Sequence, residues 1–179
     1  MASLKDKIII LTGASRGIGA AAARELATDG AHLVLCARSA DACTETKAAV
    51  EALGATAETH GFEVADFDAA KSFIDGVLDE HGRIDVLINN AGTGLMGSVA
   101  DVPPDAYLDV LKINVMGPYN MISAALPSMT AHDDGIIINI TSARAFIPDR
   151  FYAAYCSSKA ALLSMTQCLH YDLEDSNVK

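Results

Sequence analysis

One stretch near the N-terminus decides the fold: Lys7-Ile8-Ile9-Ile10-Leu11-Thr12-Gly13-Ala14-Ser15-Arg16-Gly17-Ile18-Gly19. A short apolar run typical of a buried strand leads directly into a glycine-rich turn and then into a helical pattern. In such a turn, Gly13 permits the tight bend, Gly17 lets the backbone approach a diphosphate, and Gly19 allows close helix-on-strand packing. The first turn of the helix offers free N–H groups and the positive end of the helix dipole. This order of strand, turn and helix predicts a dinucleotide-binding unit.

The rest of the chain repeats the alternation of strand and helix. We expect strands at residues 7–12, 32–37, 56–64, 86–89 and 135–140, and helices at residues 17–29, 41–53, 66–81, 104–130 and 153–176. Continuous apolar strands separated by helices are typical of a parallel sheet that is buried on both faces. Right-handed crossovers make such a sheet doubly wound. The sequence therefore predicts an α/β, Rossmann-like fold in a single domain that spans residues 1–179.

The overall charge restricts the possible partners. The chain has 179 residues and a formal net charge of −10. We therefore expect neither nucleic acid nor an anionic membrane as a partner, because neither polyanion would be attracted. The apolar run at residues 8–11 is too short to span a bilayer or to form a signal-peptide core. A cytoplasmic location is the default expectation.

Cysteines and histidines show no ligand pattern. The four cysteines lack C-x-x-C spacing, and the five histidines lack H-E-x-x-H or related spacing. Reduced thiols and solvated or helix-end histidines are the simplest interpretation, so the sequence predicts neither disulfides nor a metal site.

The end of the second strand indicates which dinucleotide is bound. NAD-binding proteins usually carry an acidic residue about twenty residues after the glycines, where it contacts the 2′-hydroxyl group. Here Ala37 is followed by Arg38, and no carboxylate comes before Asp41. Arg38 and Arg16 could instead neutralise a 2′-phosphate, although both could also be ordinary surface charges. This pattern favours NADP.

A possible proton-transfer pair lies near the start of the last helix. Tyr155 and Lys159 are four residues apart, so both side chains lie on one helix face. A phenol is a poor acid–base catalyst at neutral pH unless its surroundings favour the phenolate, as a nearby ammonium does. By itself this spacing is weak evidence, because any helix can carry it by chance.

Further motifs strengthen that interpretation. Ser142 lies thirteen residues before Tyr155, at the end of a predicted strand, and Asn89-Asn90-Ala91-Gly92 ends the fourth strand in the same crevice. Asn114 falls inside the predicted long helix, and the glycine turn has the form T-G-x-x-x-G-x-G. Over its whole length the chain resembles the short-chain dehydrogenase/reductase family in its common single-domain form.

The resemblance implies an oxidoreductase that transfers hydride between NADP(H) and a small carbonyl or alcohol substrate. Tyr155 would donate a proton to the carbonyl oxygen, and Ser142 would position that oxygen by a hydrogen bond. Lys159 would hold the nicotinamide ribose and favour the phenolate form of Tyr155. Asn114 would kink the long helix and hold a water in a proton relay toward Lys159.

The resemblance also implies a set of cofactor contacts. Asn90 would contact the ribose side, Gly92 would let the backbone approach, and Ile18 would line the diphosphate site. Glu63, followed by Val64, stands where the family usually has an adenine-facing aspartate, and its longer carboxylate can still reach the adenine amine. The complete set is Gly13, Ser15, Arg16, Gly17, Ile18, Gly19, Arg38, Glu63, Val64, Asn90, Ala91, Gly92, Tyr155 and Lys159.

The end of the chain departs from the family pattern. Family members continue with a sixth strand, a Pro-Gly segment, a substrate loop and a seventh strand, whereas this chain looks cut short. We interpret Asn177-Val178-Lys179 as the start of the sixth strand and expect an unprotected sheet edge at residues 135–140. Residues 93–96 and 144–152 would line what remains of the substrate pocket. The alternative function is therefore a truncated, non-catalytic NADP(H)-binding protein that acts as a sensor or through protein contacts.

A homo-oligomer is also expected, because family members commonly pair the long helix and the tyrosine-bearing helix across a two-fold axis. Apolar residues on these helices are compatible with such an interface and equally with core packing. They are Met121, Ile122, Leu126, Leu162, Leu163, Met165 and Leu169.

Overall fold

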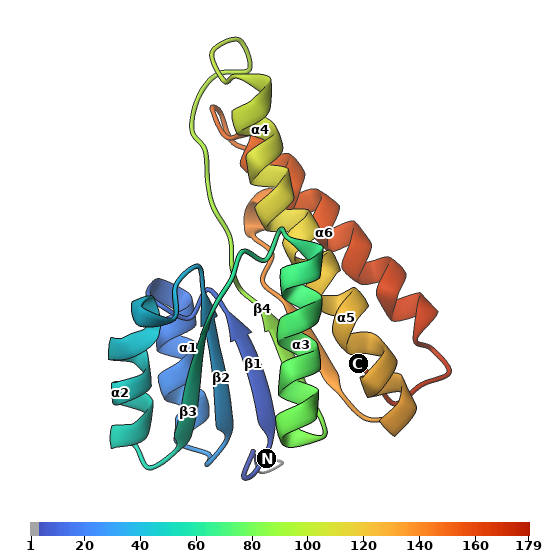
Figure 1. The fold of residues 1–179 in the computed structure, drawn as a ribbon. Coiled ribbons are helices and arrows are strands. Elements are labelled where there is room, and N and C mark those ends of the chain that lie inside the picture. Colours follow the sequence, from blue (N-terminus) through green and yellow to red (C-terminus); the bar gives the residue numbers. More distant parts are fainter. Residues whose placement is uncertain (1–3) are drawn as a thin grey trace.

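A parallel sheet of five strands forms the centre of the described part of the chain, residues 4–179 of a computed structural model (Figure 1). The strands are β1 (Ile8–Thr12), β2 (His32–Ala37), β3 (Thr56–Gly61), β4 (Val86–Asn89) and β5 (Ile136–Asn139). Their order in the sheet is β3-β2-β1-β4-β5, and every pair is parallel. The chain winds outward from β1 in both directions, so the order reverses between β1 and β4. The predicted doubly wound, Rossmann-like α/β fold is confirmed.

Helices cover both faces of the sheet (Figure 1). They are α1 (Gly17–Ala27), α2 (Thr44–Ala52), α3 (Phe67–His81), α4 (Pro104–Leu111), α5 (Gly117–His132) and α6 (Ala153–Asp172). Short 3₁₀ turns lie at Ala40–Cys43 and Ala143–Ala145, and a π-helical segment at Lys112–Met116 joins α4 to α5. No described helix is long and apolar enough to cross a membrane.

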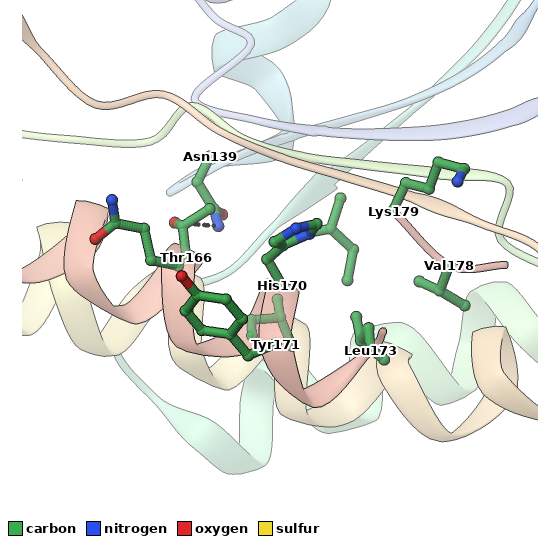
Figure 2. A pocket seen from close by; sticks show the side chains of 10 residues that line it. Asn139, Thr166, His170, Tyr171, Leu173, Val178 and Lys179 are labelled. Carbon is green, nitrogen blue, oxygen red and sulfur yellow. Dashed lines mark hydrogen bonds between the residues drawn. The ribbon is translucent and has the colours of Figure 1, made fainter. Parts of the chain in front are cut away.

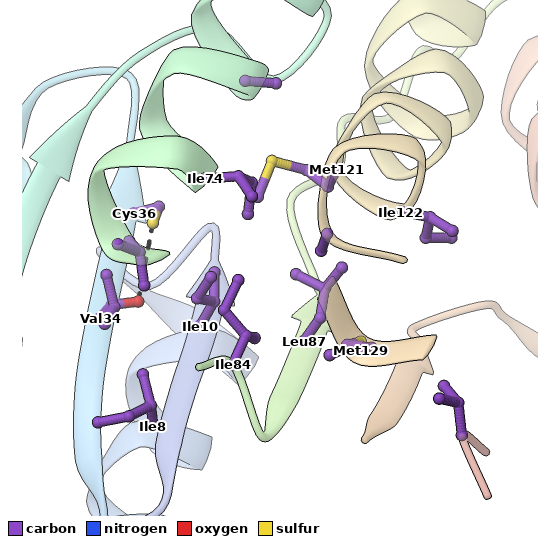
Figure 3. Close-up of a cluster of buried hydrophobic side chains, with 14 residues drawn as sticks. Ile8, Ile10, Val34, Cys36, Ile74, Ile84, Leu87, Met121, Ile122 and Met129 are labelled. Atoms are coloured by element: carbon purple, nitrogen blue, oxygen red, sulfur yellow. Dashed lines mark hydrogen bonds between the residues drawn. The ribbon is translucent and has the colours of Figure 1, made fainter. Parts of the chain in front are cut away.

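The alternation of side chains along β1 creates two separate cores. Ile8 and Ile10 point into the cluster under α3 and α5, which Figure 3 shows, whereas Ile9 and Leu11 point into the cluster under α1 and α2. Burial of each such side chain contributes roughly 1.5–3 kcal/mol relative to exposure. The unbroken apolar run that predicted a buried strand is therefore needed to fill both faces.

The structure corrects several predicted boundaries. The third strand ends at Gly61 rather than at residue 64, because its partner strand β2 ends at Ala37, which pairs with Gly61. The predicted helix at 41–53 begins as the 3₁₀ turn, and the predicted helix at 104–130 is interrupted by the π-helical segment.

The edge strand β5 is also less exposed than predicted. Val178 forms a parallel bridge with Gly135, the Lys179 N–H donates to the Gly135 carbonyl at 2.9 Å, and the Ile137 N–H donates to the Lys179 carbonyl at 2.6 Å. The interpretation of residues 177–179 as the start of a strand agrees with this pairing. The expectation of an unprotected edge at 135–140 is wrong at the amino end of β5.

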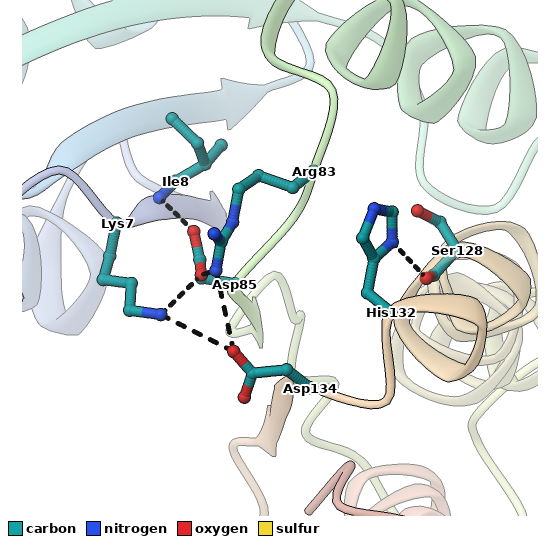
Figure 4. A network of polar contacts seen from close by, with 7 residues as sticks. All are labelled: Lys7, Ile8, Arg83, Asp85, Ser128, His132 and Asp134. Atoms are coloured by element: carbon teal, nitrogen blue, oxygen red, sulfur yellow. Dashed lines mark hydrogen bonds and ion pairs between the residues drawn. The ribbon is translucent and has the colours of Figure 1, made fainter.

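A buried carboxylate connects the amino ends of β1 and β4 (Figure 4). The Asp85 side chain is 2% exposed and accepts hydrogen bonds from Lys7 Nζ at 2.8 Å, from the Ile8 N–H at 2.9 Å and from the Arg83 guanidinium. Burial alone would raise the pKa of Asp85, but these hydrogen bonds outweigh it and hold the pKa below its usual value.

Most of the apolar residues considered for an interface belong to the core. Met121 and Ile122 lie in the cluster under α3 and α5, and Leu126, Met165 and Leu169 pack against it. Leu162 is also buried, at 1% exposure. Core packing therefore accounts for these residues, and a homo-oligomer stays a prediction.

The interpretation of the histidines as solvated or helix-end residues is correct only in part. His81 ends α3, but His32 and His81 are each only partly exposed, and their rings are tilted to one another beside Glu58, with their centres 4.7 Å apart.

Candidate active site

The carboxyl ends of β1 and β4 meet at the point where the strand order reverses, which is where open α/β sheets bind ligands. The Asn90 amide donates to the carbonyls of Thr12 and Gly13, at 2.9 and 3.1 Å. Thr12 Oγ1 accepts the N–H groups of Asn90 and Ala91, each at 3.0 Å. The Asn90 side chain thus holds the glycine turn in place. Thr12 was not predicted as a site residue, although the T-G-x-x-x-G-x-G motif contains it.

Each of the three glycines in the turn is required for a different structural reason. Gly13 has a φ of +66°, and a Cβ there would lie 2.8 Å from Ala91 Cα. A Cβ at Gly19 would overlap the Gly13 carbonyl oxygen and lie 2.7 Å from Asn90 Nδ2. Gly17 has a φ of +58° but open space around its Cβ position, so the backbone in front of α1 is accessible.

The residues of this turn fit an anionic dinucleotide. Arg16 precedes α1 in an extended conformation and makes no side-chain cap, so the first N–H groups of the helix are free to bind an anion. Arg16, Ile18 and Arg38 are exposed, and Ser15 is half-buried. Within residues 4–179, neither guanidinium forms an ion pair. Two unpaired cations at this edge of an acidic chain suit phosphate groups.

The segment after β3 reaches the same edge of the sheet. The Val64 carbonyl accepts a hydrogen bond from Asn120 Nδ2 at 3.0 Å, and a Cβ at Gly117 would lie 2.7 Å from Val64 Cγ2. Glu63 is exposed. Its contact with adenine stays a prediction.

Tyr155 and Lys159 lie on the same face of α6, as their spacing predicts. Lys159 is 5% exposed, its Nζ donates to the Ile140 carbonyl at 2.7 Å, and Nζ lies 5.9 Å from the centre of the Tyr155 ring. Burial lowers the pKa of Lys159. A Cβ at Gly92 would lie 3.3 Å from Asn114 Oδ1 and 3.6 Å from that Nζ, so the backbone at Gly92 packs close to both side chains.

Asn114 lies in the π-helical segment and is fully buried. Its Oδ1 accepts the Thr93 N–H at 2.8 Å, and its Nδ2 donates to the Thr93 carbonyl at 2.8 Å and to Ser158 Oγ at 2.9 Å. Ser158 Oγ in turn donates to the Tyr155 carbonyl at 2.7 Å. The long helix is irregular at Asn114, as the resemblance implies. Ser158 was missed, because a serine in a helix carries no signal of a buried hydrogen bond.

Ser142 lies at the carboxyl end of β5 and caps the 3₁₀ turn Ala143–Ala145, where its Oγ accepts the Arg144 N–H at 3.2 Å. Helix α6 packs against this turn, which brings Ser142 to the helix that carries Tyr155.

The two segments expected to line the substrate pocket lie side by side. The Gly97 N–H donates to the Phe151 carbonyl at 2.8 Å, and Gly97 forms a bridge with Tyr152. A Cβ at Gly94 would lie 3.9 Å from Tyr155 Cδ2. Both segments therefore flank the tyrosine.

A separate hollow of about 430 Å³ lies between β5, α6 and residues 178–179 (Figure 2). Asn139 Nδ2 donates to Thr166 Oγ1 at 2.9 Å at its wall, and Leu169, His170 and Val178 also line it. None of the predicted catalytic residues contributes to this hollow, so it is distinct from the crevice at the glycine turn.

Comparisons with known proteins identify the family of the chain. A family model described as short chain dehydrogenase matches residues 7–179. Dehydrogenase/reductase SDR family member 7B from Bos taurus is 33% identical over 99% of the chain, which spans 57% of that relative's length. A 7alpha-hydroxysteroid dehydrogenase from Clostridium sardiniense is 34% identical over 100% of the chain and 70% of the relative.

Two solved structures share the fold closely. A metagenomic short-chain oxidoreductase in complex with NADP has a TM-score of 0.95 and 37% identity, over 99% of this chain and 80% of its own. An NAD⁺-bound xylitol dehydrogenase has a TM-score of 0.95 and 31% identity, over 99% of this chain and 69% of its own. Both nicotinamide cofactors thus occur among structures of this similarity.

Proposed function

The chain belongs to the short-chain dehydrogenase family of oxidoreductases, and on that premise we propose that it transfers hydride between NADP(H) and a carbonyl or alcohol substrate, with Tyr155 as the general acid–base. The observation that carries the proposal is the convergence of Tyr155, buried Lys159 and the network through Asn114 on the crevice beside the glycine turn.

The residues that would hold the cofactor lie along the carboxyl edge of the sheet. The first turn of α1 would donate hydrogen bonds to a diphosphate, and Arg16 and Arg38 would bind a 2′-phosphate. Asn90 holds the turn that presents these groups. When bound, the nicotinamide supplies or accepts the hydride.

The chain's own residues then move the proton. In reduction, the Tyr155 hydroxyl donates its proton to the substrate oxygen as hydride reaches the carbonyl carbon, and an alcohol results. Ser142 Oγ donates a hydrogen bond to the same oxygen. The Lys159 ammonium stabilises the phenolate left on Tyr155. It also belongs to the route by which Tyr155 regains its proton. Asn114 positions the tyrosine through Ser158.

The flanking surface supports an apolar carbonyl substrate. The two segments around Tyr155, residues 93–96 and 144–152, carry four exposed apolar side chains: Met96, Phe146, Ile147 and Phe151. Such side chains favour a ligand with apolar groups around its reacting carbon.

The experiment compares Tyr155→Phe with Tyr171→Phe, an exposed tyrosine near the end of the same helix. We expect Tyr155→Phe to lower kcat with NADPH and a panel of apolar ketones by about 100-fold or more, because one positioned acid contributes about that factor. NADPH affinity, measured by fluorescence titration, should change little, and the control should behave as wild type. Turnover within about threefold of wild type in Tyr155→Phe would contradict the assignment. Tight NADPH binding without turnover in wild type would favour the non-catalytic alternative.

A further inference from the structure

A second group of polar side chains lies on the edge of the sheet away from the crevice. In the register of β2 and β3, His32 pairs with Thr56 and Val34 pairs with Glu58. Alternate residues of a strand share a face, so His32, Glu58 and His60 all point to the side that α3 covers. His81, the last residue of α3, completes the group.

The ligand-type atoms of this group are close together. Glu58 Oε1 lies 3.1 Å from His81 Nε2 and 3.8 Å from His32 Nε2. One atom from each of His32, Glu58 and His81 falls within 4.8 Å of the other two. Atoms bound at 2.0–2.1 Å around a tetrahedral zinc ion are roughly 3.3 Å apart. Small side-chain movements therefore suffice to surround one ion.

His81 Nε2 shares a hydrogen bond with Glu58 Oε1, which a bound ion would replace, whereas His32 and His60 each keep one ring nitrogen without a hydrogen bond within residues 4–179. His32 Nδ1 is 2.7 Å from Thr56 Oγ1, and when this nitrogen carries the proton, the lone pair of Nε2 is free for a metal. His32 Nε2 is buried and has no hydrogen-bond partner within the described residues. His60 Nε2 is in the same condition, 3.5 Å from Glu58 Oε2. Both nitrogens face the Glu58 carboxylate, at 3.8 and 3.5 Å, which is longer than a good hydrogen bond, so an ion bound beside Glu58 would satisfy a buried ring nitrogen.

An ion could reach this group from solvent. A groove of about 420 Å³ between β3 and α3 is lined by Glu58, His60, Phe73 and Gly76, among others. A Cβ at Gly76 would meet no atom within 4 Å, so the groove is open at Gly76, and Glu58 is the proposed ligand that lines it.

We propose that His32, Glu58 and His81 bind one divalent transition-metal ion of the zinc type, with a fourth position open toward the groove beside His60. Two imidazoles and one carboxylate are a ligand set that zinc and its first-row neighbours accept. The ion would tie β2 and β3 to the end of α3, because His32 lies in β2, Glu58 in β3 and His81 at the last position of α3. The function of the bound ion is structural, and the metal site does not depend on the proposed redox activity.

The test uses the full chain after treatment with a chelator. Zn²⁺ binding is measured by calorimetry, and the ligand type is measured from the visible spectrum of the Co²⁺ form. We expect one ion per chain and Co²⁺ bands of nitrogen and oxygen ligation. His32→Gln and His81→Gln should each weaken Zn²⁺ binding by at least tenfold. The control His132→Gln, in which an exposed histidine of α5 is changed, should bind as wild type does.

Thermal unfolding supplies an independent readout. Excess Zn²⁺ should raise the Tm of wild type and of His132→Gln but not of the two site variants, because an ion that binds only the folded state stabilises it. Circular dichroism of the metal-free forms checks that the variants fold, and Glu58→Gln gives a further variant of nearly unchanged size. The proposal is wrong if wild type shows no saturable Zn²⁺ uptake, in which case the group is a polar cluster at a sheet edge. Thiolate bands in the Co²⁺ spectrum would place the ion on a cysteine such as exposed Cys168 and would also overturn it.

Discussion

At the scale of single residues, Asn114 shows why a polar group is kept in a helix core. Its amide satisfies both backbone groups of Thr93 and the hydroxyl of Ser158. Asn114 lies in a π-helical segment, an irregularity that is frequent at functional sites, and its side chain reaches the neighbouring loop at Thr93. Removal of the amide would take this partner from the two half-buried backbone groups of Thr93, at up to about 1–3 kcal/mol for each, whereas Ser158 Oγ would keep its hydrogen bond to the Tyr155 carbonyl. Asn114 therefore fixes the loop, the helix and the tyrosine relative to one another.

Arg38 provides the residue-scale test of cofactor choice. We expect Arg38→Ala to raise the KM for NADPH about tenfold or more and to leave the KM for NADH nearly unchanged, because a charged hydrogen bond to phosphate contributes about 1.5–3 kcal/mol. Steady-state kinetics with both cofactors measure this difference. The matched control is Arg24→Ala, an exposed arginine in the last turn of α1. Equal losses with NADPH and NADH would count against a 2′-phosphate contact.

At the scale of elements, Gly19 and Gly76 lie in opposite surroundings: a side chain has no room at Gly19 in α1, whereas it has ample room at Gly76 in α3. Gly19 sits where the first helix touches the turn, and no side chain fits between them. Gly76 lies inside α3, where nothing approaches its Cβ position. The same substitution should therefore have opposite effects in the two helices.

We expect Gly19→Ala to destabilise the fold by about 1–3 kcal/mol, because the added methyl group overlaps backbone that cannot easily move. Gly76→Ala should stabilise it by roughly 0.5–1 kcal/mol, because alanine loses less conformational entropy in a helix. Urea unfolding followed by circular dichroism gives both values. Equal effects of the two substitutions would show that close packing is not the reason for Gly19.

At the scale of the whole molecule, the network around Asp85 joins segments far apart in sequence. Asp85 binds β1 and Arg83 by hydrogen bonds. In addition, Lys7 Nζ and the Arg83 guanidinium each lie 3.6 Å from the carboxylate of Asp134, which precedes β5 (Figure 4). Three strands are thus held together at the amino edge of the sheet, opposite the active-site crevice. This edge stabilises the scaffold and takes no part in the proposed reaction.

Asp85→Asn should lower the free energy of unfolding by about 2 kcal/mol at neutral pH, because charged hydrogen bonds to a buried group are lost. The folded pKa of Asp85 lies below the unfolded value of about 3.9, so the stabilisation is complete above that value and decreases as pH falls through the folded pKa. The difference between wild type and variant should therefore shrink in acid. Urea unfolding from neutral to acidic pH measures it.

The matched control is Asp75→Asn, which removes an exposed i,i+4 partner of Lys71. An exposed pair of this kind contributes less than about 1 kcal/mol, so its loss should be small at every pH. A difference between Asp85→Asn and wild type that stays constant into acid would show that the carboxylate charge is not responsible.

The sequence by itself determined that the chain forms a parallel sheet, where the crevice of that sheet lies, and which residues are candidates for the site. Local patterns carry this information: the apolar run of β1 must fill two cores, and the glycine turn can be read from neighbouring residues. The spacing of Tyr155 and Lys159 on one helix is likewise local.

Only the tertiary structure decided which distant residues meet. Strand register and the last turn of α3 bring His32, Glu58 and His81 together, although their spacing in the sequence matches no metal motif. Asn114 and Ser158 pair across two helices, and Val178 covers the start of β5. Such contacts depend on how elements pack in space, and the periodicity of a single segment contains no information about its neighbour's register.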